Sequence, residues 1–321
     1  MGGDQKKNPK EDPASIGDRE IDGGLNFYSL EKEIALGKQL AQEVERQARI
    51  VKDAVIAEYV NRVGQNIVRN SDAKVPFTIK VVDTEEVNAF ALPGGFFLVN
   101  SGLILKAESE SELAGVMAHE IAHVACRHGT KQASKGELMG IGMIAGSIAA
   151  GYGWTGYAVS QAGSLAIPVS MLMFSRKMER EADHYGLQYL YKSGYDPASF
   201  VDFLEKMEAM ERRKPGSVSR VFATHPMDED RIKAAQRELD NRTYFPPRAE
   251  YIVNTSEFND VKARVAMLHN RRKVEQEDAG NPRLRRAAGS DRPVDEGGGT
   301  GENKTGDDRP TLQRRPYGGG Q

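Results

Sequence analysis

Residues 109–129 read SESELAGVMAHEIAHVACRHG, and His119, Glu120 and His123 form the pattern H-E-x-x-H. Residues four apart on a helix share one face, so the two imidazoles would point the same way. Zinc in proteins takes neutral imidazole and carboxylate ligands at about 2 Å. Glu120 lies one step round the helix, where it can take a proton from a water on the metal. The pattern predicts a zinc site with a general base. The alternative is two histidines beside the core on an ordinary helix.

The flanking residues predict that the whole pattern is helical. Ser109 and Glu112 have the spacing of a capping box, in which each side chain satisfies a free backbone N–H. The apolar residues that follow recur at helical spacing. Gly129 is typical of the position just after a helix C-terminus, so we expect the helix to stop there. We interpret His128 as an ordinary residue of the last turn, where a basic side chain favours the helix dipole.

A catalytic zinc site needs a third protein ligand and keeps one position open. The best candidate is Glu179, on a charged stretch expected to be helical from about 175 to 192. Asp183 lies four residues later on the same face and can hydrogen-bond the far nitrogen of a ligating histidine. Glu181 points away from that face. The alternative is a solvated charged face, which such runs usually form.

Two further residues are candidates for the chemistry itself. His225 lies in a loop, within the sequence Ala-Thr-His-Pro, and Arg231 follows six residues later. Either side chain can donate a hydrogen bond to the oxyanion of a tetrahedral intermediate. The alternative for His225 is an ordinary loop histidine.

The chain between these helices and the N-terminus predicts a small sheet. Residues 77–82 alternate and are β-branched, and residues 88–92 and 96–99 are two further short apolar runs on either side of a Pro-Gly-Gly turn. Helical periodicity covers most of the rest. We expect an α+β fold that is mainly helical, with about three strands beside the H-E-x-x-H helix.

Composition indicates a globular chain with a flexible region at each end. The 321 residues are 39% hydrophobic and 28% charged, with a formal net charge of -2, so no charge excess points to nucleic acid. The expected organisation is a flexible arm over 1–27, one domain over 28–275 and a disordered tail over 276–321. Cys126 is the single cysteine, which excludes an internal disulfide and a cysteine-rich zinc site.

Residues 138–174 are apolar and rich in glycine, with no charged residue. The segment is long enough to span a membrane, but glycines and Pro168 interrupt it. We expect a helical hairpin that packs over the catalytic core, with membrane contact as the alternative.

The combined pattern resembles the M48 family of zinc metallopeptidases, and most of all its soluble exported bacterial members. Four blocks carry the resemblance in the family's order: residues 88–95, residues 119–123, residues 175–183, and residues 224–226 with Arg231 and Ile232. The resemblance implies a gluzincin-like core, one Zn²⁺ per chain and Glu120 as the base. It also implies that Asp183 contacts a ligand histidine on the side away from the metal, and that His225 and Arg231 lie close to the metal. The implied zinc ligands are His119, His123 and Glu179.

The resemblance also implies how a substrate binds and where the protein works. An extended peptide would pair with the strand formed by Asn88, Ala89, Phe90, Ala91 and Leu92. The expected function is cleavage of internal peptide bonds in proteins of the periplasm or cell envelope, although no signal peptide is present in the sequence. An alternative is a latent metalloprotein that acts as a chaperone-like binding module, with His225 closing the metal site. A third is a metal-dependent hydrolase of other substrates.

Overall fold

The computed structural model describes residues 8–137, 174–214, 225 and 229–280, and the side chains to residue 275. Chain contacts group residues 1–276 in one unit, which holds the fold, and residues 277–321 in another. The elements, in chain order, are η1 (Pro13–Ser15), α1 (Leu30–Gln47), α2 (Ala54–Arg69), β1 (Thr78–Val82), β2 (Ala89–Leu92), η2 (Pro93–Gly95), β3 (Phe96–Asn100), α3 (Ser101–Lys106), α4 (Glu110–Ala125), α7 (Arg176–Lys192), α8 (Ala198–Arg213), α10 (Glu229–Leu239) and α11 (Ser256–Gly280).

The three predicted strands form one mixed sheet in the order β1-β3-β2. β1 pairs with β3 in parallel, and β2 pairs with β3 antiparallel. The order leaves one side of β2 without a partner strand among the described residues. The mainly helical α+β fold with a small sheet is therefore confirmed.

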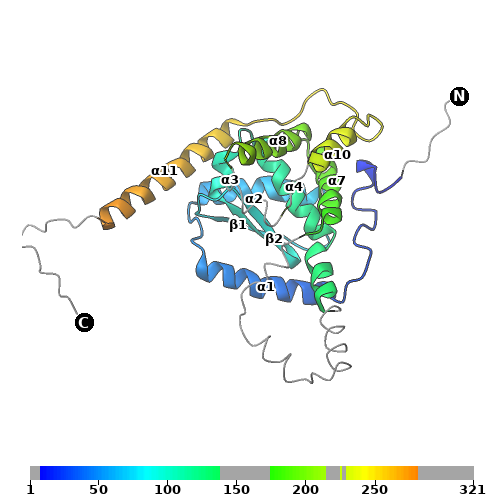
Figure 1. Ribbon diagram of the computed structural model, residues 1–321, viewed down its shortest axis with the longest axis horizontal. Coiled ribbons are helices and arrows are strands. Elements are labelled where there is room, and N and C mark those ends of the chain that lie inside the picture. The colour runs from blue at the N-terminus through cyan, green and yellow to red at the C-terminus, as the bar shows by residue number, and fades with distance from the viewer. Residues whose placement is uncertain (1–7, 138–173, 215–224, 226–228, 281–321) are drawn as a thin grey trace, which may run out of the picture. The chain divides into compact units, whose positions relative to one another are not determined.

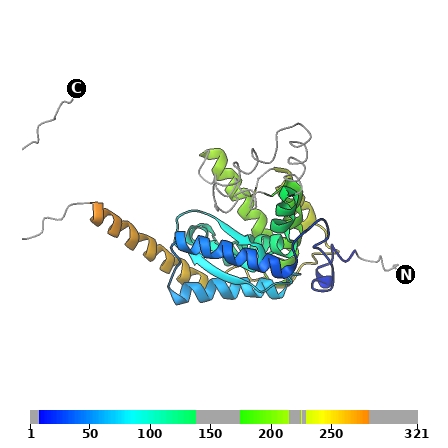
Figure 2. The same ribbon diagram turned by 90° about the horizontal axis from the view of Figure 1, so that it is seen from below.

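The sheet lies between helices. Figure 1 shows α1 below the strands and α4 on their other side, and Figure 2 shows the same arrangement from below, with α1 nearest the viewer. Alternation along β2 explains this layering, since successive side chains point to opposite faces. Ala89 and Ala91 belong to the main core with α2 and α4, whereas Phe90 and Leu92 pack in a smaller cluster with α1.

Helices α4 and α7 pack closely, and a glycine permits their approach. A Cβ atom on Gly186 would lie 3.1 Å from the Cα of His119 and 3.2 Å from its backbone nitrogen. Such contacts with backbone are tighter than side chains normally tolerate, because backbone atoms cannot rotate away. The glycine therefore lets α7 lie against the turn of α4 that carries the first histidine.

The end of α4 differs from the prediction. The helix stops at Ala125, and Arg127 takes a left-handed conformation with φ of 57° before residues 128–137 continue as a helix. Glu33 holds the strained residue in place, because Arg127 Nε donates to Glu33 Oε2 at 2.7 Å. Gly129 is not the helix stop. A Cβ there would lie 3.1 Å from Pro93 Cγ, so its small size serves packing.

The N-terminal residues from 8 onward are packed against the domain, although their composition suggests a free arm. Arg19 is buried, and its guanidinium contacts Asp72 Oδ2 at 2.9 Å and Gln188 Oε1 at 2.7 Å. Further along, the backbone N–H of Phe27 donates to the hydroxyl of Ser134. Long-range polar contacts of this kind leave no periodic pattern in the sequence.

Two predicted segments lie outside the described residues. These are the apolar stretch 138–174, apart from Phe174, and the tail from residue 281 onward. In the part of the chain that is described, no helix is both long and apolar enough to cross a bilayer.

Candidate metal centre

Two helices bring the predicted ligands together. His119 and His123 lie on α4, and Glu179 lies in the first turn of α7. The Nε2 atoms of the two histidines are 3.0 Å apart. Glu179 Oε2 is 3.5 Å from His119 Nε2, and Glu179 Oε1 is 3.6 Å from His123 Nε2. All three side chains are buried. They form a metal-site group at the contact between α4 and α7.

The donor atoms of this group fit zinc. His225 joins the three ligands, and one potential ligand atom from each of the four residues lies within 4.8 Å of all the others. Four imidazole or carboxylate donors at the corners of a small polyhedron are the set that tetrahedral zinc takes. Converging lone pairs inside a buried site repel one another unless a cation lies between them. The donors of this buried group therefore fit a zinc ion.

Asp183 and Arg231 lie directly behind the ligands. Asp183 Oδ1 is 2.9 Å from His119 Nδ1, so that nitrogen carries the hydrogen and His119 Nε2 presents its lone pair. Burial opposes the charge of Asp183, but Arg231 lowers the pKa of this carboxyl below its ordinary value. Arg231 contacts Asp183 through Nε and Nη2 at 2.8 and 2.7 Å. Its Nη1 also lies 2.8 Å from Glu179 Oε2. The guanidinium thus holds both carboxylates.

The pKa values of the ligands follow from the same contacts. Burial alone would lower the pKa of His119, but the carboxylates of Asp183 and Glu179 raise it to about 9. Burial keeps the pKa of His123 well below its ordinary value, which favours the neutral ring. Burial would raise the pKa of Glu179, yet His225 and His119 hold it well below the usual range. His123 and Glu179 thus favour the neutral imidazole and the ionised carboxylate that bind a metal, whereas a metal would have to displace a proton from His119.

Glu120 is buried beside the metal group and outside the set of four donors. Its Oε2 accepts a hydrogen bond from the backbone N–H of Ala91 at 3.2 Å, and its Oε1 lies 3.3 Å from His225 Nε2. Burial raises the pKa of Glu120 above its ordinary value, although His225 opposes the shift. A raised pKa suits a carboxylate that must take up a proton near neutral pH.

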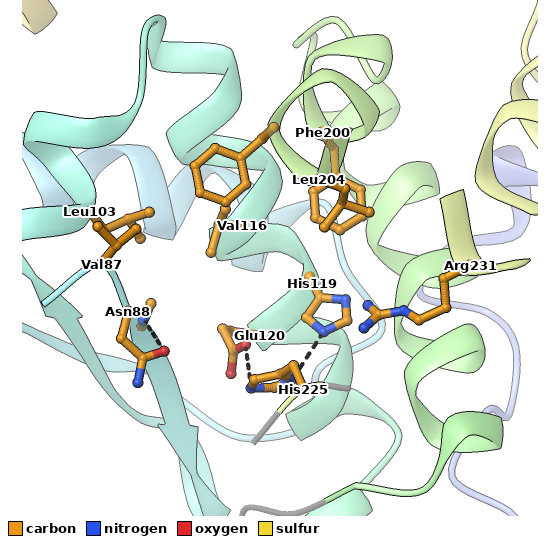
Figure 3. A pocket seen from close by; sticks show the side chains of 12 residues that line it. Val87, Asn88, Leu103, Val116, His119, Glu120, Phe200, Leu204, His225 and Arg231 are labelled. Atoms are coloured by element: carbon orange, nitrogen blue, oxygen red, sulfur yellow. Dashed lines mark hydrogen bonds and ion pairs between the residues drawn. The ribbon is translucent and has the colours of Figure 1, made fainter. Parts of the chain in front are cut away.

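His225 is positioned between the metal group and Glu120. Figure 3 shows its ring below His119, with one side toward that histidine and the other toward Glu120. His225 Nδ1 is 3.1 Å from Glu179 Oε1 and 3.4 Å from His119 Nε2. The structure therefore places this predicted residue at the site and gives each ring nitrogen a polar neighbour.

Apolar side chains line the space around the ligands, and the sequence alone did not identify them. The ring of Phe174 stacks on His123 with centroids 4.0 Å apart, and Phe200 stacks on His119 at 5.7 Å. A cavity beside Glu120 is lined mainly by apolar residues, several of which Figure 3 shows around it: Val87, Leu103, Val116, Phe200 and Leu204. These apolar walls lower the local polarity, which strengthens the electrostatic contacts of the site.

His128 is not an ordinary residue of the last turn. It is fully buried, its Nδ1 lies 2.9 Å from His123 Nδ1, and its Nε2 lies 3.3 Å from Glu181 Oε2. The prediction for His128 was wrong because it assumed that the helix continues to Gly129. In a continuous helix the side chain of His128 would point away from the metal group. The left-handed Arg127 turns the chain back toward it.

The predicted substrate strand runs past the site, and only alternate residues point their backbone outward. The carbonyl oxygen of Asn88 accepts a hydrogen bond from the N–H of Asn100 on β3, so the backbone of Asn88 faces β3. In an antiparallel ladder the bonded pairs alternate, so residues 90 and 92 also face β3. The backbone groups of Ala89 and Ala91 face the free edge, consistent with the bond from Ala91 N to Glu120.

Replacing Arg231 with methionine should destabilise the metal-free protein by about 3–5 kcal/mol at pH 7, because two buried carboxylates lose their partner. The folded pKa of Asp183 is lowered. Its contribution is therefore complete above the unfolded pKa of about 4 and is lost as pH falls through the folded pKa. Urea unfolding at pH 7 and in acid measures both effects. Arg212→Met, at an exposed ion pair, is the control and should change little. Equal effects of the two variants would contradict the assignment.

Comparisons with known proteins agree with this geometry. The sequence profile of Peptidase family M48 matches residues 55–239. The chain is 29% identical over 254 residues to the beta-barrel assembly-enhancing protease of Escherichia coli, covering 75% of this chain and 50% of that protein. The Yersinia pestis protein of the same name is 30% identical over 228 residues, covering 68% and 46%. Metalloprotease LoiP of Escherichia coli is 32% identical over 203 residues, covering 62% and 77%.

The chain spans about half the length of the two beta-barrel assembly-enhancing proteases. The matched region contains the H-E-x-x-H helix, the helix that carries Glu179, and Arg231. The family profile covers more than half of the chain, and the resemblance inferred from the sequence is confirmed. This chain belongs to peptidase family M48.

Proposed function

We propose that the protein is a zinc-dependent endopeptidase that hydrolyses internal peptide bonds of protein substrates. The convergence of His119, His123 and Glu179 beside a buried Glu120 is the observation that carries this proposal. These three residues would hold one zinc ion per chain. The ion, when bound, supplies Lewis acidity that activates water and polarises a carbonyl group.

Glu120 is the proposed general base. It takes a proton from the attacking water and then delivers that proton to the nitrogen of the leaving amine. The hydrogen bond from Ala91 N fixes Oε2, and Oε1, which lies 3.3 Å from His225 Nε2, would accept the proton. Arg231 already binds two carboxylates, so we assign it to holding Glu179 and Asp183. His225 is then the nearest donor for the oxyanion, beside Glu120.

The variant Glu120→Gln tests this assignment. The amide keeps the size of the side chain and can still accept from Ala91 N, but it cannot take a proton. Casein cleavage should fall by about 10²–10⁴-fold, and zinc content should stay at the wild-type value. Thermal unfolding of both proteins controls for the fold. Wild-type rates in the variant would exclude Glu120 as the base.

We propose that the substrate binds as an extended strand along the free side of β2. The outward carbonyls of Ala89 and Ala91 would each accept from a substrate N–H, two residues apart. The two outward N–H groups already have partners, because Ala89 N–H donates to the side chain of Asn88 and Ala91 N–H donates to Glu120. Asn88, Phe90 and Leu92 would support the strand without bonding the substrate through their backbone, because those groups face β3.

Single N-methyl groups along a peptide substrate test this register. Each methyl removes one donor and adds bulk at that amide. Methylation should lower kcat/KM by about tenfold or more at every second amide near the scissile bond, and much less at the amides between. A peptide methylated far from the cleavage site is the control. Equal losses at consecutive amides would contradict pairing with β2.

A second candidate function follows from the position of His225. A catalytic zinc site presents three protein ligands and an open position, whereas in this chain a fourth side chain joins the group. A resting form closed by His225 would be latent, and the protein would then act mainly as a chaperone-like or assembly-factor module until the histidine moves.

The names of two relatives refer to beta-barrel assembly, which supports a role in envelope protein quality control and a periplasmic location.

The variant His225→Ala separates the two roles of this histidine. If His225 closes the site, removal should raise casein cleavage severalfold, because the fourth position opens. If it serves as the oxyanion donor, kcat should fall by about 10²–10³-fold. The geometry favours the first outcome. Cleavage at the wild-type rate would exclude both roles.

A further inference from the structure

His128 connects the metal group to the exterior through two polar contacts. Its ring is fully buried, although it comes from the residues that follow α4. One nitrogen, Nδ1, lies 2.9 Å from His123 Nδ1. The other, Nε2, lies 3.3 Å from Glu181 Oε2, whose side chain is 34% exposed. A row of three side chains therefore runs from solvent to the back of a proposed zinc ligand.

The contacts determine which nitrogens carry hydrogens. An ionised carboxylate only accepts, so His128 Nε2 is the donor to Glu181. Burial disfavours a charged ring, so the other nitrogen of His128 has a lone pair. Two lone pairs would repel at 2.9 Å, so the hydrogen between the rings belongs to His123 Nδ1. His123 Nε2 then keeps its lone pair. This atom lies 3.0 Å from His119 Nε2, and the zinc ion proposed above would relieve the repulsion between the two lone pairs.

We propose that His128 is a positioning residue that holds His123 in the tautomer able to bind the metal, with Glu181 orienting His128 in turn. The inference rests on the zinc site proposed above. Asp183 supports His119 in the same way, because its Oδ1 lies 2.9 Å from Nδ1 of that ring. Both histidines of the H-E-x-x-H pattern thus have an acceptor behind them, one a carboxylate and the other a neutral imidazole.

His128 and Glu181 also form a group with Cys126, and this group has the composition of a metal site. We assign it no ion, because both nitrogens of His128 already have partners in His123 and Glu181. A metal bound there would need one of these nitrogens and would break the row of contacts. The positioning role accounts for both polar contacts of the ring.

The pair His128→Asn and His128→Leu tests the proposal with two side chains of nearly equal size. The oxygen of asparagine lies close to the position of Nδ1 and can still accept from His123, whereas leucine offers no acceptor. Zinc affinity is measured by competition with a chelating dye, without substrate, so the readout does not depend on proteolysis. Thermal unfolding of the metal-free variants reports on the fold.

Leucine should weaken zinc binding by about 10–100-fold, the usual effect of removing a partner behind a ligand. Asparagine should recover most of this loss. Equal affinities in the two variants would overturn the proposal and leave His128 as a packing residue. Absence of zinc binding by the wild type would instead contradict the proposed function itself, so the two failures are distinguishable.

A measurement on the wild type needs no substitution. The imidazole ¹⁵N resonances of the zinc-loaded protein report directly on which nitrogen of each ring carries hydrogen. The expected result is hydrogen on Nδ1 of His123 and on Nε2 of His128. Hydrogen on Nδ1 of His128 would overturn the proposal, even if the leucine variant failed to fold.

Discussion

The close approach of α4 and α7 is the constraint on which the site depends. Glu179 reaches the two histidines because α7 lies against the backbone of His119 at Gly186. A wider spacing would move the carboxylate away from both Nε2 atoms, and the group would no longer converge. The apolar residues that α4 and α7 contribute to the main core maintain this contact. Packing thus places charged groups in a position that their mutual electrostatics alone would not favour.

Burying so many polar groups requires a partner for each. Arg231 compensates two carboxylates, Asp183 and His128 support the two histidines from behind, and Ala91 N holds the base. The strand that we propose for the substrate therefore also orients the catalytic carboxylate. In the function that we propose, substrate pairing and proton transfer would be connected through one residue of β2, because the amide that contacts Glu120 belongs to the free edge of that strand.

Much of the site was predictable from the sequence because the relevant patterns are local. The spacing of His119 and His123, and that of Glu179 and Asp183, depends only on helical geometry. The three strands appear in the sequence as one alternating run and two short apolar runs beside a Pro-Gly-Gly turn. The role of His128 was not predictable, because it depends on the positive φ of Arg127, which Glu33 stabilises from far along the chain. The packing of residues 8–27 was missed for a similar reason. Arg19 finds Asp72 and Gln188 only in the folded chain.

The central claim is that one metal ion is held by His119, His123 and Glu179 at the contact of α4 and α7. Anomalous diffraction at the zinc edge, from crystals of the protein grown with zinc, tests it most directly. The account predicts one strong peak about 2.0–2.2 Å from both Nε2 atoms and from an oxygen of Glu179. A peak at the group of Cys126, His128 and Glu181 instead, or no ordered zinc at all, would contradict it.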